Sequence, residues 1–82
     1  MSKEIEALID YIRNETGYTG PLTQDEDLLE TKVLDSFSIV SLAMFAQEQF
    51  DVEFEGEDLV RENLAKLSSL VALIHRRQAG SA

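Results

Sequence analysis

Three stretches of the chain repeat apolar residues at the spacing of one helix face, and this pattern constrains the fold most. The first stretch and the last follow i, i+3, i+4, i+7 at Ile5, Leu8, Ile9 and Ile12 and at Leu67, Leu70, Val71 and Ile74. Four glycines and one proline in 82 residues leave few turn formers, which favours helices over a many-stranded sheet. The sequence therefore predicts an all-α fold.

The expected architecture is a four-helix bundle of the up-and-down type, with three main helices and a short third helix, forming one domain over residues 1–82. The helices are predicted at about residues 3–15, 36–50, 57–63 and 68–78. Ser2 is the expected N-cap of the first helix, and Ser68 or Ser69 that of the last. A long loop joins the first two helices, and such a connection in a small domain is more often functional than idle.

The second predicted helix is apolar on two faces. Its core face carries Ile39, Leu42, Ala43, Ala46 and Phe50. A second stripe, rotated around the helix, consists of Phe37, Val40 and Met44 and is extended by Glu48. An 82-residue domain has little protein with which to cover both faces, which favours a second stripe that is exposed as a partner surface. The alternative is that Phe37, Val40 and Met44 all belong to the core.

The charge is strongly negative, with 7 Lys+Arg against 16 Asp+Glu and a formal net charge of −9. The acidic residues concentrate between Asp25 and Asp58, where Lys32 is the only basic residue. Such a surface repels nucleic acid and anionic membranes, and it steers the chain toward basic partner surfaces. The N-terminal residues lack the long apolar run of a signal peptide, so a cytoplasmic location is expected.

The tripeptide Asp35-Ser36-Phe37 opens the second predicted helix. A serine in a first turn has its oxygen near unpaired backbone N–H groups and the positive end of the helix dipole, which also favour an attached phosphate. Alternatively, Ser36 or Asp35 merely caps the helix. No base accompanies Ser36 in the sequence, and an unassisted serine hydroxyl is a weak nucleophile.

The tripeptide and its surroundings resemble the acyl carrier and peptidyl carrier proteins over residues 3–77. The resemblance is carried by Leu28-Leu29-Glu30, Val33-Leu34-Asp35-Ser36-Phe37, the run from Val40 to Phe54, Glu62-Asn63-Leu64 and Leu67-Ser68-Ser69-Leu70. It implies an acyl-carrier-like bundle in which Ser36 accepts 4'-phosphopantetheine from coenzyme A, transferred by a separate phosphopantetheinyl transferase. The thiol of that arm would hold substrates as thioesters, and the chain itself would catalyse nothing.

The resemblance also implies a docking face for partner enzymes, formed by Asp35, Phe37, Val40, Met44, Glu48 and Asp51. Its expected partners are the transferase and a cargo-loading ligase or synthase with a basic surface, and the carrier is expected to be a monomer. The pathway would be of the fatty-acid, polyketide or nonribosomal-peptide type. Serines at Ser38 and Ser41, where fatty-acid carriers usually have acidic residues, favour a stand-alone carrier of a specialised pathway.

Other functions stay open on the sequence alone. The spacing of an EF-hand calcium loop is matched by Asp51, Glu53, Glu55, Gly56 and Glu62. Two of the ligand positions, however, carry the longer glutamate, which crowds the loop, and Asp58 occupies a position that is normally apolar. A helical adaptor without a cofactor is a second alternative. A hydrolase built on Ser36 and His75 is the weakest, because no nucleophile-elbow motif is present.

Overall fold

The computed structural model describes residues 3–80, with side chains described to Gln78. Its regular structure there is entirely helical, which confirms the small all-α bundle with three main helices and a short third one. The elements are α1 (Lys3–Thr16), α2 (Ser36–Phe50), a 3₁₀ turn η1 (Gly56–Asp58), α3 (Arg61–Leu64) and α4 (Leu67–Gly80). Ser2, the predicted N-cap of the first helix, lies outside the described residues.

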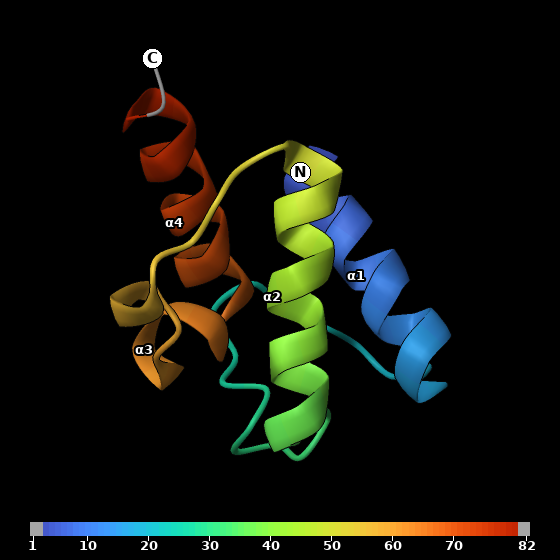
Figure 1. The fold of residues 1–82 in the computed structure, drawn as a ribbon. Helices are drawn as coiled ribbons and strands as arrows, with labels where there is room; N and C mark the ends of the chain where they lie inside the picture. Colours follow the sequence, from blue (N-terminus) through green and yellow to red (C-terminus); the bar gives the residue numbers. More distant parts are fainter. Residues whose placement is uncertain (1–2, 81–82) are drawn as a thin grey trace.

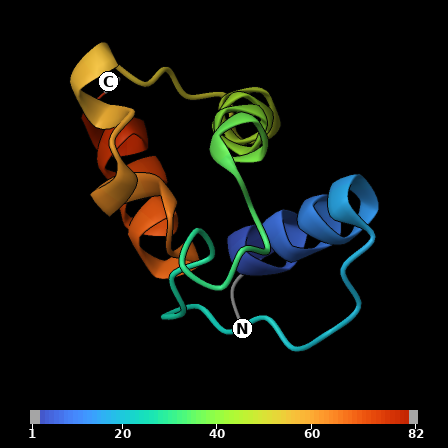
Figure 2. The same ribbon diagram turned by 90° about the horizontal axis from the view of Figure 1, so that it is seen from below.

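Three main helices, α1, α2 and α4, contact one another pairwise, whereas α3 packs mainly on α4. α1 runs opposite to α2, and α4 runs in the same general direction as α2 (Figure 1). Residues 51–66 return the chain from the end of α2 to the start of α4 and include η1 and α3. Seen from below, α2 is viewed nearly end-on, with α1 on one side and α3 and α4 on the other (Figure 2).

The core is built largely from the predicted apolar faces. It contains Ile5, Leu8 and Ile12 of α1, Ile39, Leu42, Ala43 and Ala46 of α2, and Leu67, Leu70, Leu73 and Ile74 of α4. Ile9 and Val71 of the predicted faces are only half-buried, and Leu73, which was not predicted, is fully buried. Phe50, expected on the core face of the second helix, is half-buried at its edge. Burial of these side chains supplies the main driving force for packing the helices together.

The long loop between α1 and α2 is attached to the bundle by its leucines and its backbone. Leu28 and Leu34 are buried. The Leu28 N–H donates to the Ala65 carbonyl at 2.8 Å. These contacts hold the loop beside α3, where it forms one wall of the site described below.

The prediction of one short helix over residues 57–63 is wrong. That segment is divided into η1 and α3 by Leu59 and Val60, and Val60 has the extended backbone angles φ −120° and ψ 158°. The reason is tertiary: the Asp58 carboxylate turns inward, accepts the Glu55 N–H and pairs with Arg77 of α4. A continuous helix would not leave Asp58 in this turn.

The prediction that Ser68 or Ser69 caps the last helix is also wrong. α4 begins at Leu67, so both serines lie inside its first turn. The Ser68 N–H instead donates to the Gln24 carbonyl of the long loop at 2.9 Å. A backbone group from outside the helix thus satisfies one of its unpaired N-terminal donors. No helix within residues 3–80 has the length and apolar character needed to cross a membrane.

Candidate functional site

Asp35 is the N-cap of α2, and it leaves Ser36 as the first helical residue. Its backbone is extended, and its Oδ1 accepts the N–H groups of Phe37 at 3.1 Å and Ser38 at 2.8 Å. The hydrogen bond from the Ser38 N–H is the main cause that holds the pKa of Asp35 below its usual range. Of the two capping residues that the sequence allowed, the structure therefore selects Asp35, and the Ser36 side chain takes no part in the cap.

Ser36 is the most accessible serine of the described chain. Four other serines lie within residues 3–80, and all of them are half-buried: Ser38, Ser41, Ser68 and Ser69. The Ser36 side chain is exposed at the start of α2. An enzyme that modifies a serine hydroxyl can therefore reach Ser36 without unfolding the helix.

A cavity of about 230 Å³ opens beside Ser36, between α2, the long loop and the segment around α3. We call it the α2–α3 groove. Its α2 wall consists of Ser36, Ile39, Val40, Ala43, Met44 and Gln47, and its other walls are Leu29, Leu59, Val60, Arg61 and Leu64. From Ser36 to Gln47 the helix rises by about 16 Å at 1.5 Å per residue, so the groove is elongated along α2.

The second apolar stripe of α2 is exposed, and the alternative that it belongs to the core is wrong. Phe37 is 86% exposed, Met44 58% and Val40 53%. Leu59 and Val60 add two more exposed apolar side chains on the opposite side of the groove. The sequence did not indicate this extension, because these two residues were expected inside a continuous third helix.

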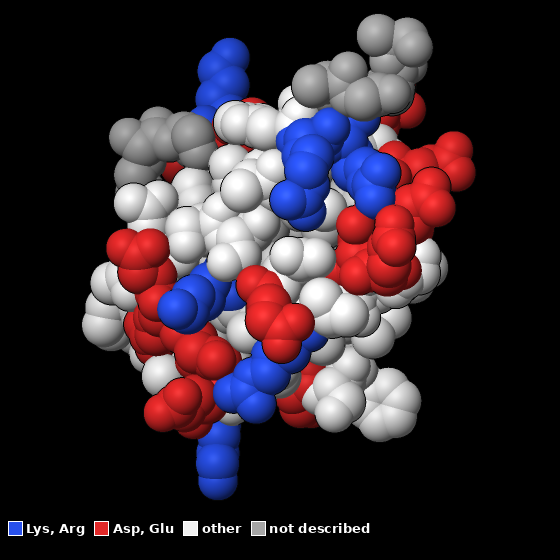
Figure 3. Space-filling view, turned by 90° about the vertical axis from the view of Figure 1, so that its left-hand side faces the viewer, with Lys and Arg blue, Asp and Glu red and all other residues white. Residues whose placement is uncertain are grey.

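The charged side chains of α2 and of its two caps are all acidic, whereas the face over α3 and α4 carries charges of both signs (Figure 3). α2 contains no basic residue, and Asp35, Glu48 and Asp51 at its two ends are exposed. The face over α3 and α4, in contrast, carries interspersed acidic and basic side chains (Figure 3). A partner that binds along α2 therefore meets a negative potential without compensating cations on that helix.

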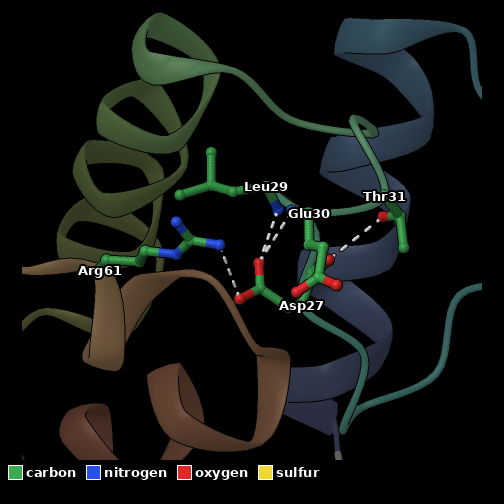
Figure 4. Close-up of polar contacts among 5 residues, drawn as sticks. All are labelled: Asp27, Leu29, Glu30, Thr31 and Arg61. Carbon is green, nitrogen blue, oxygen red and sulfur yellow. Dashed lines mark hydrogen bonds and ion pairs between the residues drawn. The ribbon is translucent and has the colours of Figure 1, made fainter.

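A second feature at the groove joins the long loop to α3 (Figure 4). Asp27 Oδ1 accepts the N–H groups of Leu29 and Glu30, each at 3.0 Å, while Asp27 Oδ2 accepts from Arg61 Nη2 at 3.1 Å. The Glu30 N–H is the main cause that lowers the pKa of Asp27, with Arg61 adding to it. The sequence contains no signal for this pair, because its members are 34 positions apart.

The acidic residues of the EF-hand pattern lie in different parts of the fold. Asp51 is the exposed C-cap of α2, Glu53 and Glu55 are exposed between α2 and η1, and Glu62 is exposed in α3. Within residues 3–80, no group of three or more His, Asp or Glu side chains is arranged to hold a metal ion. The spacing in the sequence therefore does not become a calcium loop in the fold.

The hydrolase alternative is not supported by the placement of the histidine. His75 Nε2 lies 2.9 Å from Glu4 Oε2, in the first turn of α1. That turn lies beside the C-terminal end of α2, whereas Ser36 begins this helix (Figure 1). The serine and the histidine are thus at opposite ends of the bundle.

Comparisons with known proteins give a likeness in both fold and sequence. No family model matches the chain, and no curated protein matches it. A solved structure described as "Crystal structure of FAD-dependent dehydrogenase" contains a chain that is 30% identical, with a TM-score of 0.69. The match covers 82% of the present chain and 97% of that chain, which is consequently the shorter of the two. Nearly the whole of that chain is therefore similar to this one.

Proposed function

We propose that this chain is an acyl or aminoacyl carrier protein whose Ser36 bears 4'-phosphopantetheine. The observation that carries the proposal is the state of Ser36: it is exposed, it is free of the helix cap, and it lies at the mouth of an elongated apolar groove. The other serines of residues 3–80 are half-buried. This matches the requirement for a serine that one enzyme must modify and several others must approach.

The residues around Ser36 fit a phosphate attached at its Oγ. The positive end of the α2 dipole lies at this position and favours negative charge there. Asp35 takes the capping role, so modification of Ser36 removes no capping hydrogen bond. When bound, the group supplies a thiol that holds cargo as a thioester.

The modification itself requires a second protein. A phosphopantetheinyl transferase would join Ser36 Oγ to the phosphorus atom of coenzyme A that carries the pantetheine group. The pyrophosphate bond of coenzyme A would break in the same step, and adenosine 3',5'-bisphosphate would leave. The proton of the Ser36 hydroxyl would pass to a base of the transferase, because His75 lies at the far end of the bundle. This chain therefore acts as a substrate and carrier rather than as an enzyme.

Partner enzymes are proposed to dock on α2. The exposed side chains of Phe37, Val40 and Met44 offer an apolar contact, and Asp35, Glu48 and Asp51 surround it with negative charge. Such a small surface suits transient complexes whose association rate is set by charge. The proposed partners are the transferase and a cargo-loading ligase or synthase with a basic surface, and the carrier is proposed to act as a cytoplasmic monomer.

The similar solved structure leaves this proposal unchanged. An 82-residue helical chain has no βαβ unit within residues 3–80 with which to bind a dinucleotide, so we do not propose that it is itself a flavin enzyme. The name of the similar solved structure belongs to that protein and identifies no partner of this chain.

The test is the intact mass of the folded protein after incubation with coenzyme A and a broad-specificity phosphopantetheinyl transferase. The wild type is expected to gain a single pantetheinyl phosphate, and Ser36→Ala none. Ser38→Ala is the matched control, because it changes a half-buried serine two residues along the same helix and should be modified as the wild type is. An unmodified wild type with a native circular dichroism spectrum would overturn the proposal and favour a cofactor-free adaptor.

A further inference from the structure

The α2–α3 groove has a single cationic group among its lining residues. Most of its walls are apolar, and the polar exceptions are Ser36, Gln47 and Arg61. Gln47 Oε1 already accepts the Phe54 N–H at 2.8 Å. Arg61 is therefore the one lining residue that brings both a positive charge and several hydrogen-bond donors to this apolar cavity.

Asp27 holds the Arg61 side chain in a defined place. Two backbone N–H groups, those of Leu29 and Glu30, fix the Asp27 carboxylate, and its other oxygen accepts from Arg61 Nη2. The second terminal nitrogen of Arg61 points away from Asp27 toward α2 (Figure 4). The side chain is 57% exposed, so these remaining donors are accessible to a molecule that lies in the groove.

We propose that Arg61, positioned by Asp27, donates a hydrogen bond to a carbonyl oxygen of the chain attached to Ser36 as that chain lies along the α2–α3 groove. This inference rests on the proposed function, since it requires a group on Ser36. The groove begins at Ser36 and follows α2 for about 16 Å, so a linear chain attached there can follow it past Arg61.

The electrostatics favour a neutral oxygen acceptor over a carboxylate. Asp27 already balances the charge of Arg61, and the protein as a whole carries −9, which repels an anion. A carbonyl oxygen accepts from the free N–H groups of Arg61 without bringing a charge into the apolar groove. Amide carbonyls of the prosthetic arm and the carbonyl of its cargo share this chemistry.

The experiment compares methyl and arginine Nε–H resonances in the unmodified, pantetheinylated and octanoyl-loaded proteins, the last made with octanoyl-coenzyme A. Modification is expected to shift the methyl groups of Val40 and Leu64 and the Nε–H of Arg61. In Arg61→Gln the ratio of groove-bound to free chain should fall by about tenfold, the change expected from losing one hydrogen bond to a charged group. Arg61→Lys should retain part of the effect.

Two further variants test whether Asp27 positions the Arg61 side chain for binding in the groove or only stabilises the fold. Asp27→Asn keeps an oxygen for the Leu29 and Glu30 N–H groups but removes the charge that holds Arg61, so it should weaken groove binding less than Arg61→Gln does. Glu62→Gln, an exposed neighbour outside the groove lining, should behave as the wild type. If Arg61 only stabilises the fold, Arg61→Gln should change the methyl resonances of the groove by the same amount in the unmodified and in the modified protein.

The outcomes distinguish this inference from the proposed function. A Ser36 adduct whose groove shifts are equal in the wild type and Arg61→Gln overturns the role of Arg61 while leaving the carrier function intact. Failure to form any adduct overturns the carrier function itself. If Arg61→Gln already weakens groove binding in the pantetheinylated protein, the acceptor is a carbonyl of the arm. If Arg61→Gln weakens groove binding only after octanoyl loading, the acceptor is the carbonyl of the cargo.

Discussion

Asp58 and Arg77 form a largely buried ion pair that links the segment of residues 51–66, which joins α2 to α4, to α4 itself. Asp58 Oδ2 accepts the Arg77 Nε–H at 2.7 Å and lies 2.6 Å from Arg77 Nη2. The same oxygen accepts the Glu55 N–H at 2.8 Å, and the Asp58 side chain is only 7% exposed. The pair thus determines where Leu59 and Val60 lie, and with them one wall of the groove.

Asp58→Asn is expected to lower the free energy of unfolding at pH 7 and to reduce its dependence on acid. Arg77, and then the Glu55 N–H, hold the pKa of Asp58 below its usual range. The stabilisation is therefore fully present above the unfolded pKa of about 3.9 and is lost as the pH falls through the folded value. Urea unfolding between pH 2 and 7 (roughly the window of carboxylate titration) measures the difference between the two proteins.

Glu57→Gln is the matched control, because it removes a carboxylate from the neighbouring exposed residue. It should leave both the stability at pH 7 and the acid dependence nearly unchanged. If Asp58→Asn and the wild type lose stability in parallel on acidification, the Asp58–Arg77 pair is not a source of the acid sensitivity.

The two faces of α2 should respond oppositely to truncation. Leu42 is fully buried, so Leu42→Ala is expected to cost about 2–5 kcal/mol of unfolding free energy. Val40 is 53% exposed, so Val40→Ala should change it by less than about 0.5 kcal/mol. Denaturant unfolding of both variants decides the matter, and a large loss in Val40→Ala would mean that the exposed stripe packs against the core after all.

Asp51→Gly is expected to stabilise the protein by about 1 kcal/mol, because a left-handed backbone costs an L-residue roughly 1–2 kcal/mol that glycine does not incur. Asp51 ends α2 with φ 54° and ψ 51°. Asp51→Asn separates the backbone from the charge, since it removes only the unfavourable interaction of a carboxylate with the helix C-terminus. Thermal unfolding should rank glycine above asparagine and asparagine above the wild type. Equal gains in the two variants would assign the whole effect to charge.

Glu48→Lys is expected to slow modification of Ser36 by a transferase with a basic docking surface. The substitution reverses an exposed charge on α2, so kcat/KM should fall by roughly threefold to tenfold at low salt through a slower association. The difference should shrink at high ionic strength, because salt screens exposed charges. Glu6→Lys makes the same charge change on α1 and should have little effect, and equal slowing by both variants would exclude a docking site on α2.

The sequence alone determined the helices whose stabilising contacts are periodic along the chain. The buried positions Ile5, Leu8 and Ile12 follow the predicted face of α1, and Ile39 and Leu42 follow that of α2. These predictions held because a helix is formed by contacts between residues three and four apart, which the order of residues records directly. The start of α2 at Asp35 and Ser36 was predictable for the same reason.

Only the tertiary structure decided the features that join distant residues. The split between η1 and α3 depends on Asp58 reaching Arg77, 19 positions away. The place of Arg61 in the groove depends on Asp27, 34 positions away. Which acidic residue meets which cation is set by how the helices pack, and local spacing carries no record of it. The exposure of Phe37, Val40 and Met44 was decided in the same way, because an apolar stripe is buried only where another element packs against it.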